Sequence, residues 1–265
     1  MTSFVCNICR SYLRHPINHQ YAICKNCGHV YQPRTQEDEY YHNLPCSFPK
    51  DYEQHAIRRA DYIMDFVRRE YKRPIRKVLD VGCGPGAVLD AIQKQLPDAG
   101  CYGCTLGKSN NPKIYSIDIE KDYMIDDDFD LIILSHVAEH FFSPISTMKR
   151  IGHLLSPVGT MYLEVPSFHW VEVRTRSIFT PEHMSYFTPN SLLNVVLLAD
   201  LVPSFFKESR YWGNIKMLCY RSSQPLTNTI KKVDYRRVLG YHRFVKFLYP
   251  WYRLVKHVRK VGPNE

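Results

Sequence analysis

The apolar positions of residues 75–222 change their period repeatedly, and this alternation predicts an α/β fold. Short buried runs such as Lys77–Val81 predict strands, whereas apolar residues three and four apart predict helices. Strands and helices alternate along this region, as in a doubly wound, Rossmann-like parallel sheet. Seven strands are expected, at 77–81, 101–106, 114–119, 130–135, 160–165, 204–207 and 214–221. The helices of this region are expected at 86–96, 145–155 and 188–201.

Three further segments flank this α/β domain. Residues 1–30 contain the closely spaced cysteines, and residues 31–74 form a connector with one predicted helix, from Tyr52 to about Arg69. Residues 223–265 form a basic, aromatic tail. The predicted order is therefore a small module, a connector, an α/β domain and a helical tail.

The cysteines of residues 1–30 have the spacing of a zinc site. Cys6 and Cys9 form one CxxC pair, and Cys24 and Cys27 form a second pair. A tetrahedral zinc ion needs four thiolates at about 2.3 Å, and two tight turns present two thiolates each. Thirty residues cannot bury a sufficient apolar core, so a metal would supply folding free energy. We expect a structural zinc, because four protein ligands leave no position for a substrate.

The net charge of +9 comes from residues 221–265, the tail and the two residues before it. Residues 1–220 contain equal numbers of basic and acidic side chains, whereas residues 221–265 contain 11 Lys and Arg against two acidic residues. This distribution argues against nucleic acid as the partner of the α/β domain. No signal peptide and no apolar run of roughly 20 residues is evident. With paired cysteines typical of reduced metal sites, this predicts a cytoplasmic protein.

The tail has two interpretations. Between Val233 and Val261, basic residues alternate with aromatic ones, as in a helix that makes peripheral contact with the inner face of an anionic membrane. Alternatively, the tail is a terminal helix that packs on its own protein and exposes a basic face to solvent. The sequence leaves both open.

A glycine-rich turn follows the first predicted strand of the α/β domain. Asp80 precedes Gly82, Gly84 and Gly86 in the segment LDVGCGPG. Glycines let the chain turn sharply and let a ligand approach the main chain closely. An acid just before a short GxGxG resembles the first motif of class I S-adenosylmethionine-dependent methyltransferases. The resemblance implies that Asp80 and the three glycines bind S-adenosylmethionine.

The resemblance continues downstream and covers about residues 75–222. Asp118 has the spacing of the family's acid that faces the adenine, and His136 begins an H-V-x-E-H sequence that implies a further cofactor contact. At the end of the second strand, Thr105 stands where the family usually has an acid that binds the ribose. Some members have G-x-T-L-S at this point, which Gly103–Leu106 resembles. A hydroxyl binds a ribose more weakly than a carboxylate does, by about 1 kcal/mol, so we expect looser cofactor binding.

The segment PEHMSYFTP supplies candidates for proton transfer. The zinc module, the H-V-x-E-H sequence and Glu182-His183 together resemble sugar-nucleotide C-methyltransferases and relatives that modify polysaccharides. In those enzymes the histidine matching His183 is the proposed general base, which Glu182 could orient. From ordinary imidazole chemistry we expect a pKa of His183 of ~6.5, or one moderately displaced by Glu182; the alternative is a packed or capping histidine. Tyr40 and Tyr41 could close over the site as a lid or could pack in an ordinary interface, and His140 and Tyr186 are further candidates for contact with the substrate.

These features predict a methyltransferase that acts on a sugar nucleotide or a surface glycan. Two alternatives remain at this point. One is an RNA base methyltransferase, because some of these enzymes combine a zinc module with this fold; the neutral charge of residues 1–220 opposes it. The other is a catalytically silent protein with a Rossmann-like domain and a zinc module, which Thr105 alone favours.

Overall fold

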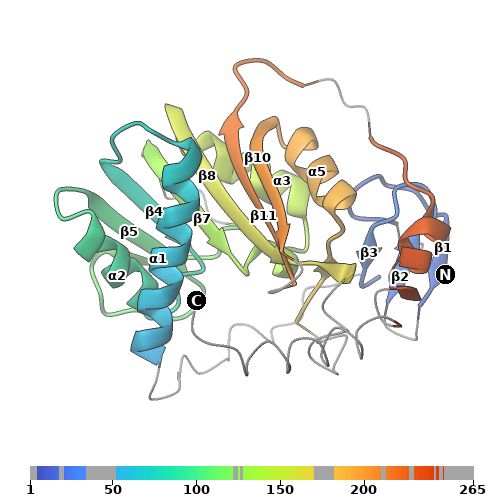
Figure 1. Ribbon diagram of the computed structural model, residues 1–265, viewed down its shortest axis with the longest axis horizontal. Coiled ribbons are helices and arrows are strands. Elements are labelled where there is room, and N and C mark those ends of the chain that lie inside the picture. Colours follow the sequence, from blue (N-terminus) through green and yellow to red (C-terminus); the bar gives the residue numbers. More distant parts are fainter. Residues whose placement is uncertain are drawn as a thin grey trace, which may run out of the picture.

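Two β-sheets form the framework of the chain (Figure 1). The computed structural model describes residues 5–17, 21–33, 52–121, 125, 128–169, 182–209, 213–226, 230–241, 243, 244 and 247. The larger sheet has seven strands in the order β10-β11-β8-β7-β4-β5-β6. Its strands are β4 (Lys77–Val81), β5 (Gly100–Thr105), β6 (Ile114–Ser116), β7 (Phe129–Ser135), β8 (Leu155–Pro166), β10 (Leu201–Ser209) and β11 (Asn214–Arg221).

The direction of the strands confirms a doubly wound sheet with one exception. All neighbours from β6 to β8 pair in parallel, whereas β11 is antiparallel to both β8 and β10. The chain returns from Ser209 to Asn214 through a short connection, and so short a link produces an antiparallel hairpin. The sheet is therefore mixed, not wholly parallel. The strand order reverses between β4 and β7, and ligands of such sheets bind at the carboxyl ends of strands beside this reversal.

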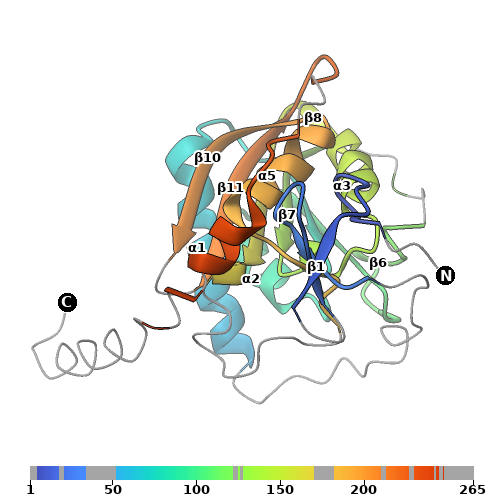
Figure 2. The ribbon, with the colours of Figure 1, turned by 90° about the vertical axis from the view of Figure 1, so that its right-hand side faces the viewer.

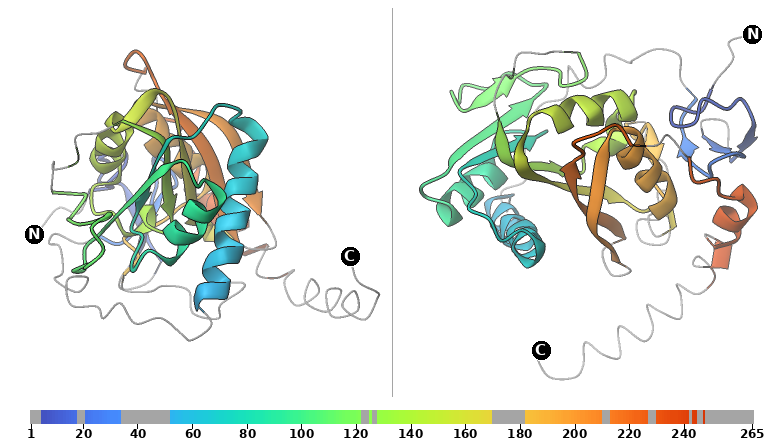
Figure 3. Two further views of the ribbon diagram at one scale, coloured as in Figure 1. Left: turned by 90° about the vertical axis from the view of Figure 1, so that its left-hand side faces the viewer. Right: turned by 90° about the horizontal axis from the view of Figure 1, so that it is seen from above.

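Among the described residues, four helices cover the two faces of the larger sheet: α1 (Tyr52–Glu70), α2 (Ala87–Gln95), α3 (Pro144–His153) and α5 (Pro189–Leu198). Figure 3 shows α1 and α2 on one face and α3 on the other. The apolar positions predicted for α1, including Ala60, Ile63 and Met64, are buried against the strands together with residues of α2. Helices α3 and α5 contribute to a second core on the opposite face. Both faces of the strands are thus removed from water, which explains their near-continuous apolar runs.

Several predicted boundaries differ from the structure. Strand β10 begins at Leu201, the residue to which a helix was predicted to extend, and α5 ends at Leu198. Strand β8 already begins at Leu155, although a helix was predicted to reach that residue. A register shift between Phe129 and Leu131 accommodates the extra length. The two strands approach closely there because residue 159 is glycine: a Cβ atom at this position would lie 2.5 Å from the Phe129 carbonyl oxygen. Strand β6 ends at Ser116 because Asp118 starts a turn, in which its carboxylate accepts the backbone N–H of Glu120.

The smaller sheet has four strands, in the order β1-β2-β3-β9. Its first three strands, β1 (Arg14–Pro16), β2 (Ala22–Cys24) and β3 (Val30–Tyr31), come from the cysteine module, and β9 (Ser185–Tyr186) comes from the segment PEHMSYFTP. In Figure 2 the smaller sheet is turned toward the viewer, and β1 lies in front of the larger sheet. None of these strands was predicted from the sequence. The segment with the candidate base therefore belongs to the same sheet as the cysteine module.

The described part of the tail packs on the cysteine module. Residues 235–241 are helical, and Val238 shares a hydrophobic cluster with Tyr21 and Tyr186. A Cβ atom on Gly28 would lie 3.0 Å from the Val238 side chain. Up to residue 241 the tail therefore follows the packing interpretation. Among the described residues, no helix is both long enough and apolar enough to cross a membrane.

Candidate functional site

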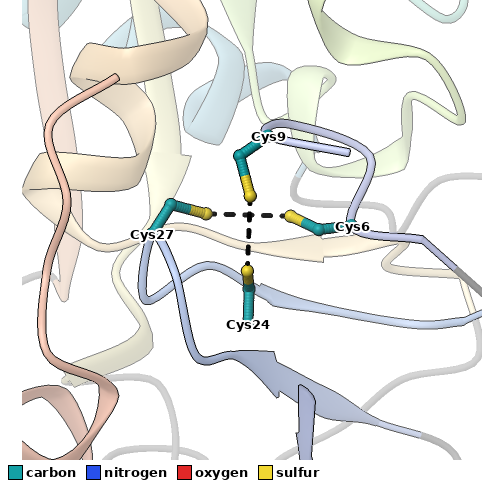
Figure 4. Close-up of side chains that lie close together, drawn as sticks. All are labelled: Cys6, Cys9, Cys24 and Cys27. Carbon is teal, nitrogen blue, oxygen red and sulfur yellow. Dashed lines mark hydrogen bonds between the residues drawn. The ribbon is translucent and has the colours of Figure 1, made fainter. Parts of the chain in front are cut away.

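The four cysteines of the module converge on one point (Figure 4). The Sγ atoms of Cys6 and Cys27 lie 3.7 Å apart, those of Cys9 and Cys24 lie 3.4 Å apart, and all four lie within 4.8 Å of one another. Thiolates about 2.3 Å from a tetrahedral ion are separated by about 3.8 Å, so the donor set has the dimensions of a zinc site.

The two CxxC turns have the same backbone shape. The Cys6 carbonyl accepts the N–H of Arg10, and the Cys24 carbonyl accepts the N–H of Gly28. Arg10 and Gly28 have φ angles of 58° and 69°, which lie in the left-handed region. Gly28 adopts this conformation without strain, because it has no Cβ atom. The repeated turn aims both cysteine pairs inward.

The glycine-rich turn lies directly after β4, at the reversal of the strand order. Gly82, Gly84 and Gly86 have φ angles of 73°, 55° and 93°, so each needs the backbone freedom of glycine. The N–H of Gly82 donates to the Cys104 carbonyl of β5. A Cβ atom on Gly82 would lie 2.4 Å from Val137, just past the end of β7. The turn is thus packed between the ends of β5 and β7.

The acidic and hydroxyl residues predicted for the cofactor follow neighbouring strands. Asp80 is buried near the end of β4, and this burial raises its pKa to about 7, although Arg59 lowers it in part. Thr105 is the last residue of β5. Asp118 follows β6, with its Oδ2 3.3 Å from Lys121 Nζ. The structure therefore brings the predicted set to one edge of the sheet.

A pair of histidines lies beside this edge. His140 ends the short 3-10 helix η2 (Ala138–His140), and its ring centroid is 4.9 Å from that of His183. Nδ1 of His140 lies 2.9 Å from the Glu182 carbonyl oxygen, so it donates a hydrogen bond there. Because η2 starts next to Val137, which packs on Gly82, the histidine pair is linked to the glycine turn through a few contacts.

Glu139 is a site residue that the sequence analysis missed. Its side chain is 1% exposed, and its carboxylate lies within 4.8 Å of ring nitrogens of His140 and His183. Oε1 of Glu139 is 3.3 Å from Nδ1 of His136. Burial acts to raise the pKa of Glu139, but His136, His140 and His183 lower it overall, so the residue carries a negative charge. Its position within H-V-x-E-H was visible in the sequence, but its direction toward three imidazoles was not.

The electrostatics of His183 differ from expectation. Burial lowers the pKa of His183 to about 4, and the carboxylate that most counteracts this effect is Glu139, ahead of Glu182. The imidazole is therefore neutral at pH 7 by a wider margin than the expected pKa of ~6.5 implies. Glu182 contributes its backbone carbonyl to His140.

Of the residues expected at the substrate, Tyr186 lies next to His183. Its side chain is 1% exposed and packs against Tyr21 and His183, with ring centroids 5.5 Å and 5.3 Å away. The enclosed ring of Tyr186 therefore supports that of His183. Tyr40 and Tyr41 lie outside the described residues.

A model of the methyltransferase domain family matches residues 52–202, more than half of the chain. The chain belongs to this family. A comparison with curated proteins finds no match. The fold and the family identify the chain as an S-adenosylmethionine-dependent methyltransferase of class I.

Solved structures support the methyltransferase fold. The plantazolicin methyltransferase BpumL in complex with SAH is 16% identical with a TM-score of 0.52, and the match covers 64% of this chain and 87% of that one. An S-adenosylmethionine-dependent methyltransferase from Clostridium acetobutylicum is 11% identical with a TM-score of 0.51, over 62% and 91% of the two chains. The PH0226 protein from Pyrococcus horikoshii is 16% identical with a TM-score of 0.52, over 71% and 100%.

A second polar cluster of the methyltransferase was not predicted. Glu164 of β8 is buried and accepts hydrogen bonds from Arg59 of α1 at 3.0 Å and from Asn214 of β11 at 2.6 Å. Asn214 also donates to Nε2 of His136, which places the ring proton on Nδ1 toward Glu139. Lys216 is fully buried, and its Nζ lies 3.3 Å from the ring centroid of Tyr62. This cluster ties α1 to the strand ends and fixes the orientation of His136.

The burial of His183 predicts an unusual titration. In an NMR titration of the imidazole signals, His183 should titrate near pH 4, because charging its ring inside the protein is unfavourable. Glu139→Gln should lower the pKa of His183 further, since it removes the carboxylate that most stabilises the charged ring. The signal of His183 is identified as the one that is missing from the spectrum of His183→Ala. Titration near pH ~6.5 would contradict the buried placement.

Proposed function

We propose that the methyltransferase transfers a methyl group from S-adenosylmethionine to a sugar, either a sugar nucleotide or a surface glycan, with His183 as the general base. The observation that carries this proposal is the pairing of His140 and His183 beside the glycine turn. An acceptor held against these imidazoles would lie next to the cofactor edge of the sheet. The resemblance of Glu182-His183 and of H-V-x-E-H to sugar-modifying enzymes supports a sugar as this acceptor.

The residues around the glycine turn fit S-adenosylmethionine. Three glycines at alternate positions, all with left-handed φ angles, leave no side chain between the main chain and a close ligand. We assign the cofactor to this turn, with Asp80, Thr105, Asp118 and His136 as further contacts. When bound, S-adenosylmethionine supplies a methyl group that is already activated by its sulfonium. The chain therefore has to position the acceptor and to manage its proton.

His183 suits proton removal because its ring is neutral and stands near a buried carboxylate. With S-adenosylmethionine bound as the methyl donor, the proton that the acceptor loses on methylation would pass to a ring nitrogen of His183. Glu139 stabilises the imidazolium that results, since it lies within 4.8 Å and retains its charge. His140 is oriented by the Glu182 carbonyl and borders the same space.

The four thiolates suit a structural zinc ion, and we propose about one zinc per chain, bound by Cys6, Cys9, Cys24 and Cys27. Elemental analysis of the freshly purified protein should find this stoichiometry. Cys24→Ser should abolish it, because three thiolates hold zinc less well. Cys219→Ser is the matched control, since this buried cysteine lies in β11, and it should keep the zinc. A zinc-free wild-type protein would refute the assignment.

Gly84→Val should abolish the binding of S-adenosylmethionine. A β-branched residue is strongly disfavoured at a φ of 55°, so the turn would lose its shape. Calorimetry should show an affinity loss of at least about tenfold, which corresponds to about 1.4 kcal/mol of strain at the site. Gly240→Ala is the control, because nothing lies within 4 Å of the added methyl group, and it should bind normally. Equal affinities for both variants would place the cofactor elsewhere.

His183→Ala should slow methyl transfer by about 10²–10⁴-fold, the usual contribution of a positioned base. The affinity for S-adenosylmethionine should stay the same, because the substitution removes help given to the transition state only. The assay follows labelled methyl groups into sugar nucleotides and glycans, with RNA as the comparison acceptor. Label that enters RNA and no sugar would favour an RNA base methyltransferase. Normal turnover by the variant would exclude His183 as the base.

A further inference from the structure

The segment from Glu182 to Phe187 runs between the two sheets. On one side, β9 pairs with β3 of the cysteine module, where Val30 lies opposite Tyr186 and Tyr31 opposite Ser185. On the other side, Phe187 forms a bridge to Ser167 and accepts the N–H of Phe168, just past the end of β8. The candidate base is thus part of a connection between the module and the methyltransferase sheet.

Three consecutive residues of this segment are hydrogen-bonded to residues 21–32 of the module and its last strand. The hydroxyl of Tyr21 donates to the His183 carbonyl at 3.1 Å. The N–H of Gln32 donates to the Met184 carbonyl at 2.9 Å. The hydroxyl of Ser185 lies 3.2 Å from Nε2 of His29, a ring that is completely buried. The module therefore holds the segment through both its backbone and its side chains.

The aromatic rings extend this connection to the imidazole itself. Tyr186 lies between Tyr21 and His183, with centroid distances of 5.5 Å and 5.3 Å. Tyr21, Tyr186, Ile23, Val30 and Val238 belong to one hydrophobic cluster. Any displacement of Tyr21 would therefore alter the environment of the His183 ring as well as its backbone.

The cysteine cluster determines the shape of the hairpin that makes these contacts. Cys24 is the last residue of β2, and Cys27 lies in the turn that leads to β3. Tyr21 precedes β2, and His29 precedes β3, so both lie within three residues of a thiolate. A strand of only two residues, such as β9, does not hold its shape without a fixed partner.

We propose that the cysteine module positions His183 for catalysis, with Tyr21 and Ser185 as the positioning residues. This inference rests on the proposed role of His183, and it gives the module a part in methyl transfer in addition to its own folding. A base is effective only when its geometry is held by surrounding contacts, and here those contacts come from outside the Rossmann-like sheet.

The test compares Tyr21→Phe with Tyr12→Phe in the full chain. Tyr21→Phe removes only the hydroxyl that binds the His183 carbonyl, whereas Tyr12 belongs to the same module but has an exposed side chain. In Tyr21→Phe, amide hydrogen exchange at residues 183–187 should accelerate about tenfold, as expected for one lost hydrogen bond. The kcat should fall by a similar factor. Zinc content and the affinity for S-adenosylmethionine should stay at the wild-type values, and Tyr12→Phe should match the wild type throughout.

The pH profile separates positioning from a general loss of stability. A looser segment would admit water to the His183 ring, so the acid limb of kcat/KM should move from about pH 4 toward ~6.5. Lower stability alone would reduce the amount of active enzyme and leave that limb in place. Ser185→Ala should move the limb in the same direction, because it removes the contact with His29.

The outcomes also distinguish this inference from the proposed function. If exchange at 183–187 and the pH profile are unchanged in Tyr21→Phe and in Ser185→Ala, the positioning role is refuted. If the affinity for S-adenosylmethionine falls together with kcat, the module supports the whole domain and not this segment, which also overturns the inference. Faster exchange in Tyr21→Phe together with normal turnover by His183→Ala would have two consequences. It would support the contact between the module and the segment, and it would exclude His183 as the base.

Discussion

The pairing of β3 with β9 is the interaction on which the site depends. It involves only Val30 and Tyr31 on one side and Ser185 and Tyr186 on the other, yet together with the bridge from Phe187 to Ser167 it joins the cysteine module to the end of β8. A small module cannot bury enough apolar surface to fold alone, and a two-residue strand cannot persist alone. Each part supplies what the other lacks. The thiolate cluster shapes the hairpin, and β9 extends the hairpin into a sheet of four strands.

The charged side chains of the site depend on their buried surroundings. Glu139 is buried among three imidazoles, and Glu164 is buried among Arg59, Asn214 and Tyr162. Removing a carboxylate from water is costly, so each one persists only with several partners around it. The two clusters meet at His136, whose ring accepts a hydrogen bond from Asn214 and faces Glu139. The end of β7 is therefore held by electrostatic contacts from α1, β8 and β11.

The glycine turn and the histidine pair are coupled through packing. Val137 touches Gly82, and three residues later His140 meets His183. This short path explains how the glycine turn after β4 and the histidine pair from η2 and residues 182–187 lie at one edge of the sheet. It also agrees with the reversal of strand order between β4 and β7, which opens this edge to ligands.

Features that depend on neighbours in the sequence were determined by the sequence itself. The helix α1, the strand β4 and the strand β11 were predicted because apolar spacing reports local geometry, and the three glycines and two CxxC pairs encode their own turns. The tertiary structure alone decided which distant groups meet. Strand β9 is too short to show a period, and Glu139 looks like any acid until η2 turns it toward the imidazoles. The low pKa of His183, the burial of Tyr186 and the packing of residues 233–241 on the module depend on desolvation and long-range contacts, which no local pattern contains.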